Sequence, residues 1–244
     1  MSTHPDSSTT IQHDRLDGLV DAAGAELTAA GPMRYRGAAY LPELDGGPWF
    51  DPSAWQWAAS VEDAWPEIRH EFETMAAQAV TQEYRQPFDA DRHAPGRPAT
   101  GGSGGWDVVF LQRHGTWVKR NADLFPATRA TLVRSPIATG EAMFSVLGPG
   151  QRILPHSSGC NLVVTCHLPL DVPPGAGICV AGQNRTWTEG AILAFDDSWL
   201  HRAWNDADRP RVVLIWDVWH PGLTADEVDR LSGLLPRLMP DIEG

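Results

Sequence analysis

Between residues 141 and 219 the chain is a succession of short β-rich segments separated by turn residues, and this feature limits the possible folds most strongly. Glycine, proline, asparagine and aspartate stand between the segments, at short and similar spacings. Such a pattern is typical of a sandwich or barrel and argues against βαβ units. The segments are EAMFSVL, QRILPH, NLVVTCHLPL, GICVAG, TWT, AILAF, HRAW and RVVLIWDVW.

Two helices and one strand are expected before this region. Pro66 should kink or restart the first helix, and Ser60 with Asp63 has the form of a capping box, which favours a start near residue 61. WDVVFLQ reads as a strand, and NADLFPATRATL reads as a short helix with Asn121 as its cap. The first helix is indicated by apolar residues spaced by four, three, four and three positions: Val61, Trp65, Ile68, Phe72 and Met75.

The remaining segments give the expected domain organisation. Residues 1–30 are rich in Ser, Thr, Ala and Gly and read as a flexible extension. Residues 31–244 form one domain, with its β core over about 141–221 and a C-terminal helix, capped by Thr224, over about 224–239. The Pro- and Gly-rich stretch 89–105 is a loop by composition, and a lid on the substrate side is a fair interpretation.

Charge and composition exclude several classes of partner. The net charge of −12 argues against nucleic acid and anionic lipid surfaces. No apolar run is long enough to span a bilayer, and the polar N-terminus lacks the apolar stretch of a signal peptide. The three cysteines are odd in number and lack a paired zinc-like spacing. We therefore expect a reduced, cytoplasmic protein.

The stretch ILPHSSGCN, residues 153–161, contains half of a metal-site pattern. His156 follows an apolar run, but Ser158 stands where a carboxylate ligand would be expected. Alone, His156 reads as a ligand without its partner, as a turn histidine, or as part of a site that leaves this position empty. His201 and Arg211 lie on later segments, and a small barrel could bring all three together because alternate strand residues point inward.

At these residues the chain resembles the aspartyl/asparaginyl β-hydroxylase family of Fe(II)- and 2-oxoglutarate-dependent oxygenases. The resemblance covers the chain apart from the N-terminal extension and the C-terminal helix. It implies a mainly β fold, with a double-stranded β-helix (jelly-roll, cupin-like) core and flanking α-helices. The blocks that carry it are GPWFDPSAWQWAASVEDAWPEIRHEF, FSVLGPGQRILPHSSGCN, CHLPL, RTWTEGAILAFDDSWLHRAWND and RVVLIWDVWHPGL.

The resemblance also implies a set of cofactors and ligands. Most oxygenases of this class hold iron with two histidines and one carboxylate. In the β-hydroxylase branch two histidines hold Fe(II) and water takes the third position, so His156 and His201 are the implied metal ligands and catalytic residues. Ser158 is then no defect, although other members typically have glycine there. 2-Oxoglutarate and O2 are the implied cosubstrates.

The cosubstrate residues follow in the same way. Arg211 matches the family arginine that binds the distal carboxylate of 2-oxoglutarate, for which its planar fork is suited. Ser145 matches a serine that shares this carboxylate, and His167 matches a histidine near the cosubstrate. Thr165 and Val163 stand where arginines are common, which puts aspartate itself in doubt as the substrate.

A turn before His201 completes the expected site. Asp196, Asp197 and Ser198 are interpreted as the turn that aims His201 through Asx-type hydrogen bonds. Asp197 could also orient an iron ligand through a hydrogen bond.

The expected function is a hydroxylase in specialised metabolism. Its substrate would be an amino acid, a carrier-bound aminoacyl or peptidyl group, or a small natural product. A halogenase on the same iron centre and a jelly-roll binding protein without turnover are the alternatives. The sequence does not indicate the oligomeric state.

Overall fold

The computed structural model describes residues 15–16, 19, 28–31, 33–37, 39–44, 46–79, 82–83 and 105–238. The extension expected over 1–30 lies outside these residues except at a few positions, and so does the loop expected over 89–105 except for Gly105. Within the described part of the chain, no helix is long and apolar enough to cross a membrane.

Strands make up most of the regular structure, and helices are fewer. The strands are β1 (Thr28–Gly31), β2 (Arg34–Arg36), β3 (Trp49–Phe50), β4 (Gln82–Glu83), β5 (Trp106–Arg113), β6 (Thr116–Trp117), β7 (Ile137–Leu147), β8 (Arg152–His156), β9 (Val163–Asp171), β10 (Ala176–Val180), β11 (Gln183–Arg185), β12 (Leu193–Phe195), β13 (His201–Asn205) and β14 (Arg211–Trp219). The helices are α1 (Ala58–Asp63), α2 (Trp65–Met75), α4 (Lys119–Ala122), α5 (Pro126–Leu132) and α6 (Ala225–Leu238), with 3-10 turns η1 (Pro42–Leu44), η2 (Pro52–Ala54) and η3 (Ala76–Gln78).

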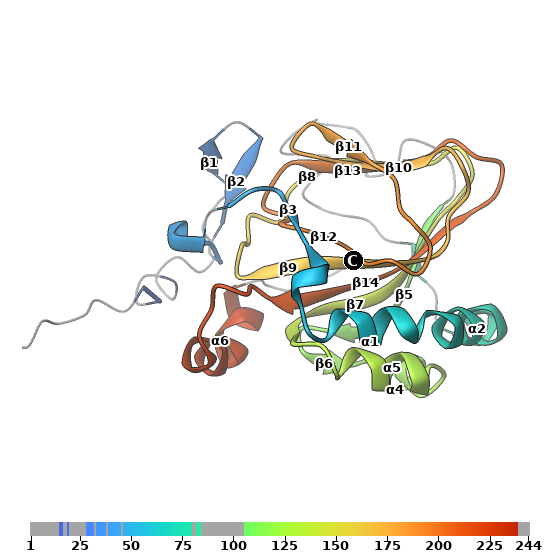
Figure 1. The fold of residues 1–244 in the computed structure, drawn as a ribbon, viewed down its shortest axis with the longest axis horizontal. Helices are drawn as coiled ribbons and strands as arrows, with labels where there is room; N and C mark the ends of the chain where they lie inside the picture. The colour runs from blue at the N-terminus through green and yellow to red at the C-terminus, as the bar shows by residue number, and fades with distance from the viewer. Residues whose placement is uncertain are drawn as a thin grey trace, which may run out of the picture.

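Two antiparallel sheets face each other and form the core of the fold (Figure 1). The smaller sheet has the order β11-β10-β13-β8, and the larger has the order β3-β12-β9-β14-β7-β5-β4, with β6 beside β5. Helices α1, α2, α4 and α5 cover the outer face of the larger sheet in the same view. This arrangement confirms the predicted mainly β, jelly-roll core with flanking helices.

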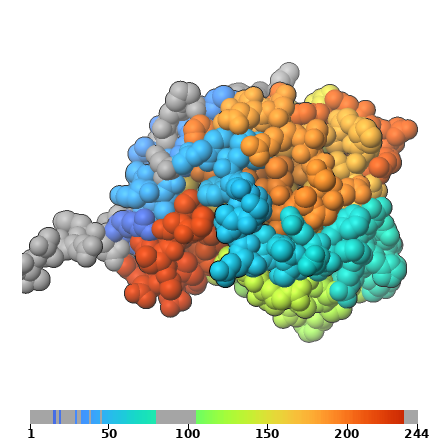
Figure 2. Space-filling model, in the orientation of Figure 1, coloured from blue at the N-terminus to red at the C-terminus, as the bar shows by residue number. Residues whose placement is uncertain are grey.

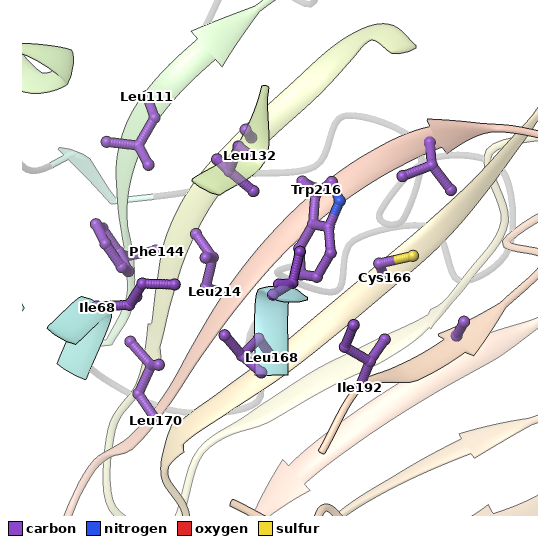
Figure 3. Close-up of a cluster of buried hydrophobic side chains, with 14 of the residues drawn as sticks. Ile68, Leu111, Leu132, Phe144, Cys166, Leu168, Leu170, Ile192, Leu214 and Trp216 are labelled. Carbon is purple, nitrogen blue, oxygen red and sulfur yellow. The ribbon is translucent and has the colours of Figure 1, made fainter. Parts of the chain in front are cut away.

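The central strands β9 and β14 are buried on both faces, which explains why their sequences are almost continuously apolar. On the helix side, Leu168 and Leu214 pack with Ile68 of α2 (Figure 3). Burial of each such side chain stabilises the fold by about 1.5–3 kcal/mol. Polar side chains on these strands, such as His167 and Arg211, are exceptions that mark the space between the sheets as a candidate site.

The first predicted helix is interrupted just before Pro66, as expected for a proline. Pro66 stands at the start of α2, after a turn at Ala64 that separates α2 from α1. The predicted start near residue 61 is wrong, because α1 begins at Ala58. The hydroxyl of Ser60 donates to the carbonyl of Trp57, so it does not cap a helix that starts after it.

The second predicted helix is in fact two short ones, α4 and α5. Asn121 lies inside α4 and its side-chain amide donates to the carbonyl of Phe110 in β5, so the prediction that it is the cap is wrong. The backbone N–H groups at the N-terminus of α5 find their hydrogen-bond acceptor on another helix, α2. The carboxylate of Glu71 accepts from the backbone N–H groups of Ala127 and Thr128. The local sequence around α5 does not predict this cap, because Glu71 is distant in the chain.

The C-terminal helix α6 begins after Thr224. Thr224 and Glu227 form a reciprocal capping box, with the hydroxyl of Thr224 accepting from the Glu227 backbone N–H. Leu231 and Leu235 of this helix are buried in a cluster at one end of the larger sheet. Figure 2 shows this red helix beside the blue N-terminal part of the chain, and Arg15 donates to Glu227 there.

Candidate functional site

The two predicted metal ligands lie next to each other on neighbouring strands. His156 ends β8 and His201 begins β13, and the antiparallel register places them directly opposite each other. Their ring centroids are 4.0 Å apart with an interplanar angle of 55°. The ring of Phe195, at the end of β12, contacts His201 edge-on at 5.2 Å. The fold therefore converts two histidines that are distant in sequence into one pair.

Both imidazoles are held with the same nitrogen facing the backbone. The Nδ1 atom of His156 lies 2.8 Å from the carbonyl oxygen of Leu154, and that of His201 lies 2.9 Å from the carbonyl oxygen of Trp199. Because a carbonyl oxygen only accepts, each Nδ1 must carry a hydrogen, and Nε2 is the atom through which either ring would bind a metal ion. Burial lowers the pKa of His201 to about 4, so its ring is neutral near pH 7. A pair of imidazoles oriented in this way suits a divalent metal ion bound through Nε2.

The third position of the predicted metal site belongs to Ser158. Its hydroxyl donates to Oδ1 of Asp197 at 2.6 Å and accepts from the backbone N–H of Cys160 at 3.0 Å. Among the residues that the structure describes, no three His, Cys, Asp or Glu side chains converge as a metal-binding group. What the described chain offers a metal at this place is the histidine pair, with a carboxylate one hydrogen bond further away.

The carboxylate of Asp197 belongs to a small acidic group between the sheets. Burial raises the pKa of Asp197 well above its usual value, and the nearby Asp217 adds to this shift. Burial also raises the pKa of Asp217 to about 6, although Asp217 accepts from the Glu141 backbone N–H at 3.0 Å and from the Thr165 hydroxyl at 3.1 Å. Thr165 thus occupies a place lined by acidic groups.

The turn before His201 is built around Asp196. The Ser198 backbone N–H donates to Oδ1 of Asp196 at 2.9 Å, as expected for an Asx-type turn. Arg34, which no sequence pattern indicates, is buried and donates both to Oδ2 of Asp196 at 2.6 Å and to the Ser198 hydroxyl at 3.0 Å. The interpretation of Asp197 as part of the same hydrogen-bonded turn was incomplete, because its carboxylate bonds to Ser158 instead.

A second group of polar side chains surrounds Arg211, the first residue of β14. Arg211 is only 1% exposed. Its Nη1 donates to the hydroxyl of Ser145 at 3.2 Å, while its Nε is buried without a hydrogen-bond partner in the described structure. Its guanidinium lies over the ring of Trp187 at 5.2 Å, and burial lowers its pKa to about 9. A buried, still charged arginine with an unused donor suits an anionic ligand such as a carboxylate.

His167 lies between the two groups. The Nε1–H of Trp187 donates to its Nδ1 at 3.1 Å, and its ring contacts Phe195 at 5.1 Å. Burial lowers its pKa well below the usual range, and the nearby Arg211 and His201 side chains lower it further. The five predicted site residues therefore form two neighbouring groups, joined by His167 and Phe195.

Two cationic side chains lie away from these groups, and one predicted strand differs from expectation. Lys119 is exposed on α4, where it pairs with Asp123. Arg113 lies 3.8 Å from Glu141 at the end of β5. TWT is not a strand, since β11 ends at Arg185 and Trp187 follows it with a buried side chain. The functional contacts of Trp187 were missed, although it stands in the RTWTEG block that carries the family resemblance.

Comparison with known proteins agrees with that resemblance. The sequence profile described as "Aspartyl/Asparaginyl beta-hydroxylase" matches residues 62–221. The human "Aspartate beta-hydroxylase domain-containing protein 2" is 34% identical over 202 residues, covering 79% of this chain and 53% of the relative. The "Ornithine lipid ester-linked acyl 2-hydroxylase" of Rhizobium tropici is 32% identical over 182 residues, covering 73% of this chain and 63% of the relative.

The matches are partial in length. The match to the human protein spans only about half of that relative. Among solved structures, a Pseudomonas putida prolyl-4-hydroxylase aligns with 67% of this chain and 99% of its own at 15% identity, with a TM-score of 0.40. The family assignment therefore rests on the sequence matches.

Proposed function

Because this chain belongs to the aspartyl/asparaginyl β-hydroxylase family, we propose that it is an Fe(II)- and 2-oxoglutarate-dependent oxygenase that hydroxylates an unactivated C–H bond. One observation carries the proposal. Two imidazoles lie side by side, each with its Nδ1 held by a backbone carbonyl, near a buried arginine that has an unused donor. A metal ion with an acidic chelating cosubstrate satisfies both features at once.

The residues present fit both groups. His156 and His201 would hold iron through Nε2, with Nδ1 of each ring anchored to a backbone carbonyl. Bound there, Fe(II) supplies the activation of O2 that is coupled to conversion of 2-oxoglutarate to succinate and CO2. Arg211 and Ser145 would bind the distal carboxylate of 2-oxoglutarate, since buried donors compensate a buried carboxylate. His167 would donate a hydrogen bond to the cosubstrate.

The chain's own contribution is positioning and exclusion of water. Phe195 is 1% exposed, and its ring separates His167 from His201 by contacting both. Trp187 contacts His167 and Arg211, Trp106 contacts Ser145, and both tryptophans are buried. Such a closed, apolar surround strengthens the interaction of Arg211 with a carboxylate. It also keeps water from the reacting carbon.

The proposed substrate is an amino acid, a carrier-bound aminoacyl or peptidyl group, or a small natural product, in specialised metabolism of the cytoplasm. Thr165 faces Asp217, and Asp197 lies nearby. A free aspartate side chain would bring a further carboxylate toward these acids without the arginines that are common at residues 163 and 165 in the family. The names of the relatives cover both aspartate and an ornithine lipid, so family membership leaves the substrate open.

The alternative of halogenation rests on Ser158, which leaves the third metal position without a carboxylate. The structure supports hydroxylation better. The Ser158 hydroxyl already donates to Asp197, and a halide beside it would have to approach that acidic group. A binding protein without turnover has no need for the buried charge of Arg211, whose desolvation lowers its pKa.

The proposal is tested by turnover. Purified protein, Fe(II) and 2-oxoglutarate are incubated in air with a library of amino acids, carrier-bound aminoacyl groups and small natural products. The expected result is succinate formation, together with a product that gains one oxygen atom in its mass spectrum. His201→Ala is the matched inactive control. Succinate release from this variant at the wild-type rate would contradict the assignment of His201 as an iron ligand.

A further inference from the structure

Two buried tryptophans donate hydrogen bonds to two of the cosubstrate residues. The Nε1–H of Trp106 donates to the hydroxyl oxygen of Ser145 at 2.8 Å. The Nε1–H of Trp187 donates to Nδ1 of His167 at 3.1 Å. An indole nitrogen is a donor only, so neither bond can reverse its direction. Each tryptophan therefore determines whether its partner donates or accepts a hydrogen bond toward a ligand.

The bond from Trp187 determines the tautomer of His167. Because Nδ1 accepts, it carries no hydrogen, and the neutral ring must carry its hydrogen on Nε2. Burial keeps the ring neutral, in agreement with the lowered pKa of His167. The Nε2 atom makes no hydrogen bond with any residue that the structure describes. His167 therefore presents an N–H donor to whatever occupies the space beside it.

The bond from Trp106 has the same effect on Ser145. A hydroxyl has two acceptor positions and one hydrogen. Its oxygen accepts from Trp106 at 2.8 Å and from Nη1 of Arg211 at 3.2 Å, so both acceptor positions are used. No acceptor for its hydrogen is found among the described residues. The O–H of Ser145 is thus left to donate to a ligand.

We propose that Trp106 and Trp187 are positioning residues that fix the hydrogen-bond polarity of the cosubstrate pocket, so that Ser145 and His167 act as donors only. The inference rests on the function proposed above. With the unused Nε–H of Arg211, the pocket then offers three donors from three different strands. A pocket with donors alone selects a dianionic dicarboxylate, because a ligand hydroxyl or amide would bring hydrogens that find no acceptor.

The direct test reads the tautomer of His167 in the metal-free protein. Ring nitrogen chemical shifts of ¹⁵N-histidine-labelled protein distinguish the two neutral tautomers, and a His167→Asn sample identifies the signal. We expect the Nε2–H form in the wild type and its loss in Trp187→Phe, which keeps an aromatic ring but removes the donor. The matched control is Trp65→Phe, since Trp65 donates to the Pro169 carbonyl at 2.7 Å outside this pocket. It should leave the signal of His167 unchanged.

A second measurement follows 2-oxoglutarate binding by calorimetry with Mn(II) in place of iron. Trp187→Phe should weaken binding by about tenfold, the size expected when one buried hydrogen bond is misdirected. Trp106→Phe should weaken it less, because Ser145 keeps its hydrogen. Each effect should vanish when the partner is already removed, in the Ser145→Ala or His167→Asn background, since a positioning residue acts through its partner.

The outcomes separate this inference from the proposed function. Wild-type protein that binds no 2-oxoglutarate would overturn the proposed function and the dicarboxylate part of the inference, while the tautomer experiment would still decide the role of Trp187. An Nδ1–H or doubly protonated His167 in the wild type would overturn the inference even if turnover is found. So would a Trp187→Phe variant with an unchanged tautomer and unchanged affinity.

Discussion

The charge of Arg211 can be removed with most of its buried volume retained by an Arg211→Met substitution. In the folded protein its pKa is lowered by burial to about 9, so below about pH 9 the charged form costs stability, and this cost is relieved as pH rises above 9 toward the usual arginine range. One pKa unit corresponds to about 1.4 kcal/mol, so the cost is on the order of several kcal/mol. Without cosubstrate, the variant should therefore unfold no earlier than the wild type.

Although Arg211→Met should not lower the stability of the protein, it should weaken the binding of 2-oxoglutarate. Loss of a buried, hydrogen-bonded charge partner costs about 2–5 kcal/mol. Each 1.4 kcal/mol is a factor of ten, so affinity for 2-oxoglutarate should fall by roughly 30-fold to several thousand-fold. Arg211→Lys should keep part of the affinity, because it keeps a charge but not the planar fork.

The assay combines thermal unfolding of the metal-free protein with calorimetric titration of 2-oxoglutarate in the presence of Mn(II). Arg209→Met is the matched control, since Arg209 stands two residues earlier and pairs with Asp171 at the surface. It should leave the affinity unchanged. Unchanged affinity in Arg211→Met, or an equal loss in both variants, would refute the reasoning.

Three further predictions concern the acidic groups, the substrate and the halide. The pKa of Asp217 is raised to about 6 by burial, so its contribution to stability is present at low pH and lost as pH rises through about 6. The unfolding temperature of Asp217→Asn should therefore rise relative to that of the wild type between about pH 4 and about pH 6, and a difference that does not change with pH would contradict this. With Thr165 and Val163 in place of cations, free L-aspartate should be a poor substrate in competition with a larger, less acidic one, and its selection as best substrate would count against the account. In excess chloride or bromide the product should still gain oxygen, because Ser158 is engaged with Asp197, and a dominant halogenated product by mass and isotope pattern would overturn hydroxylation.

The sequence predicts the parts of the fold that depend on local pattern. Most of the β segments become strands close to their expected bounds, because alternating and apolar runs record which faces of a sheet are buried. Pro66 restarts a helix as expected, since its ring is tolerated only in the first turn. The pairing of His156 with His201 was anticipated as convergence inside a barrel, and the antiparallel register supplies the contact.

Contacts made between distant segments could not be predicted in the same way. Arg34 reaches Asp196 and Glu71 caps α5 through pairings that leave no periodic signal. The pattern predicts a strand at Trp187, whereas the chain leaves β11 before this residue and turns the indole toward His167. The direction of such a side chain depends on the backbone path of the loop, and this path is determined by the packing of the whole fold.

The central claim is that His156 and His201 hold iron through their Nε2 atoms. It is tested most directly by an anomalous-scattering crystal structure of the protein loaded with Fe(II) and 2-oxoglutarate without oxygen. The account predicts one iron peak bonded to both Nε2 atoms, with 2-oxoglutarate on the same metal and its distal carboxylate on Arg211. Iron bound elsewhere, iron bonded through an Nδ1 atom, or a distal carboxylate away from Arg211 would contradict it.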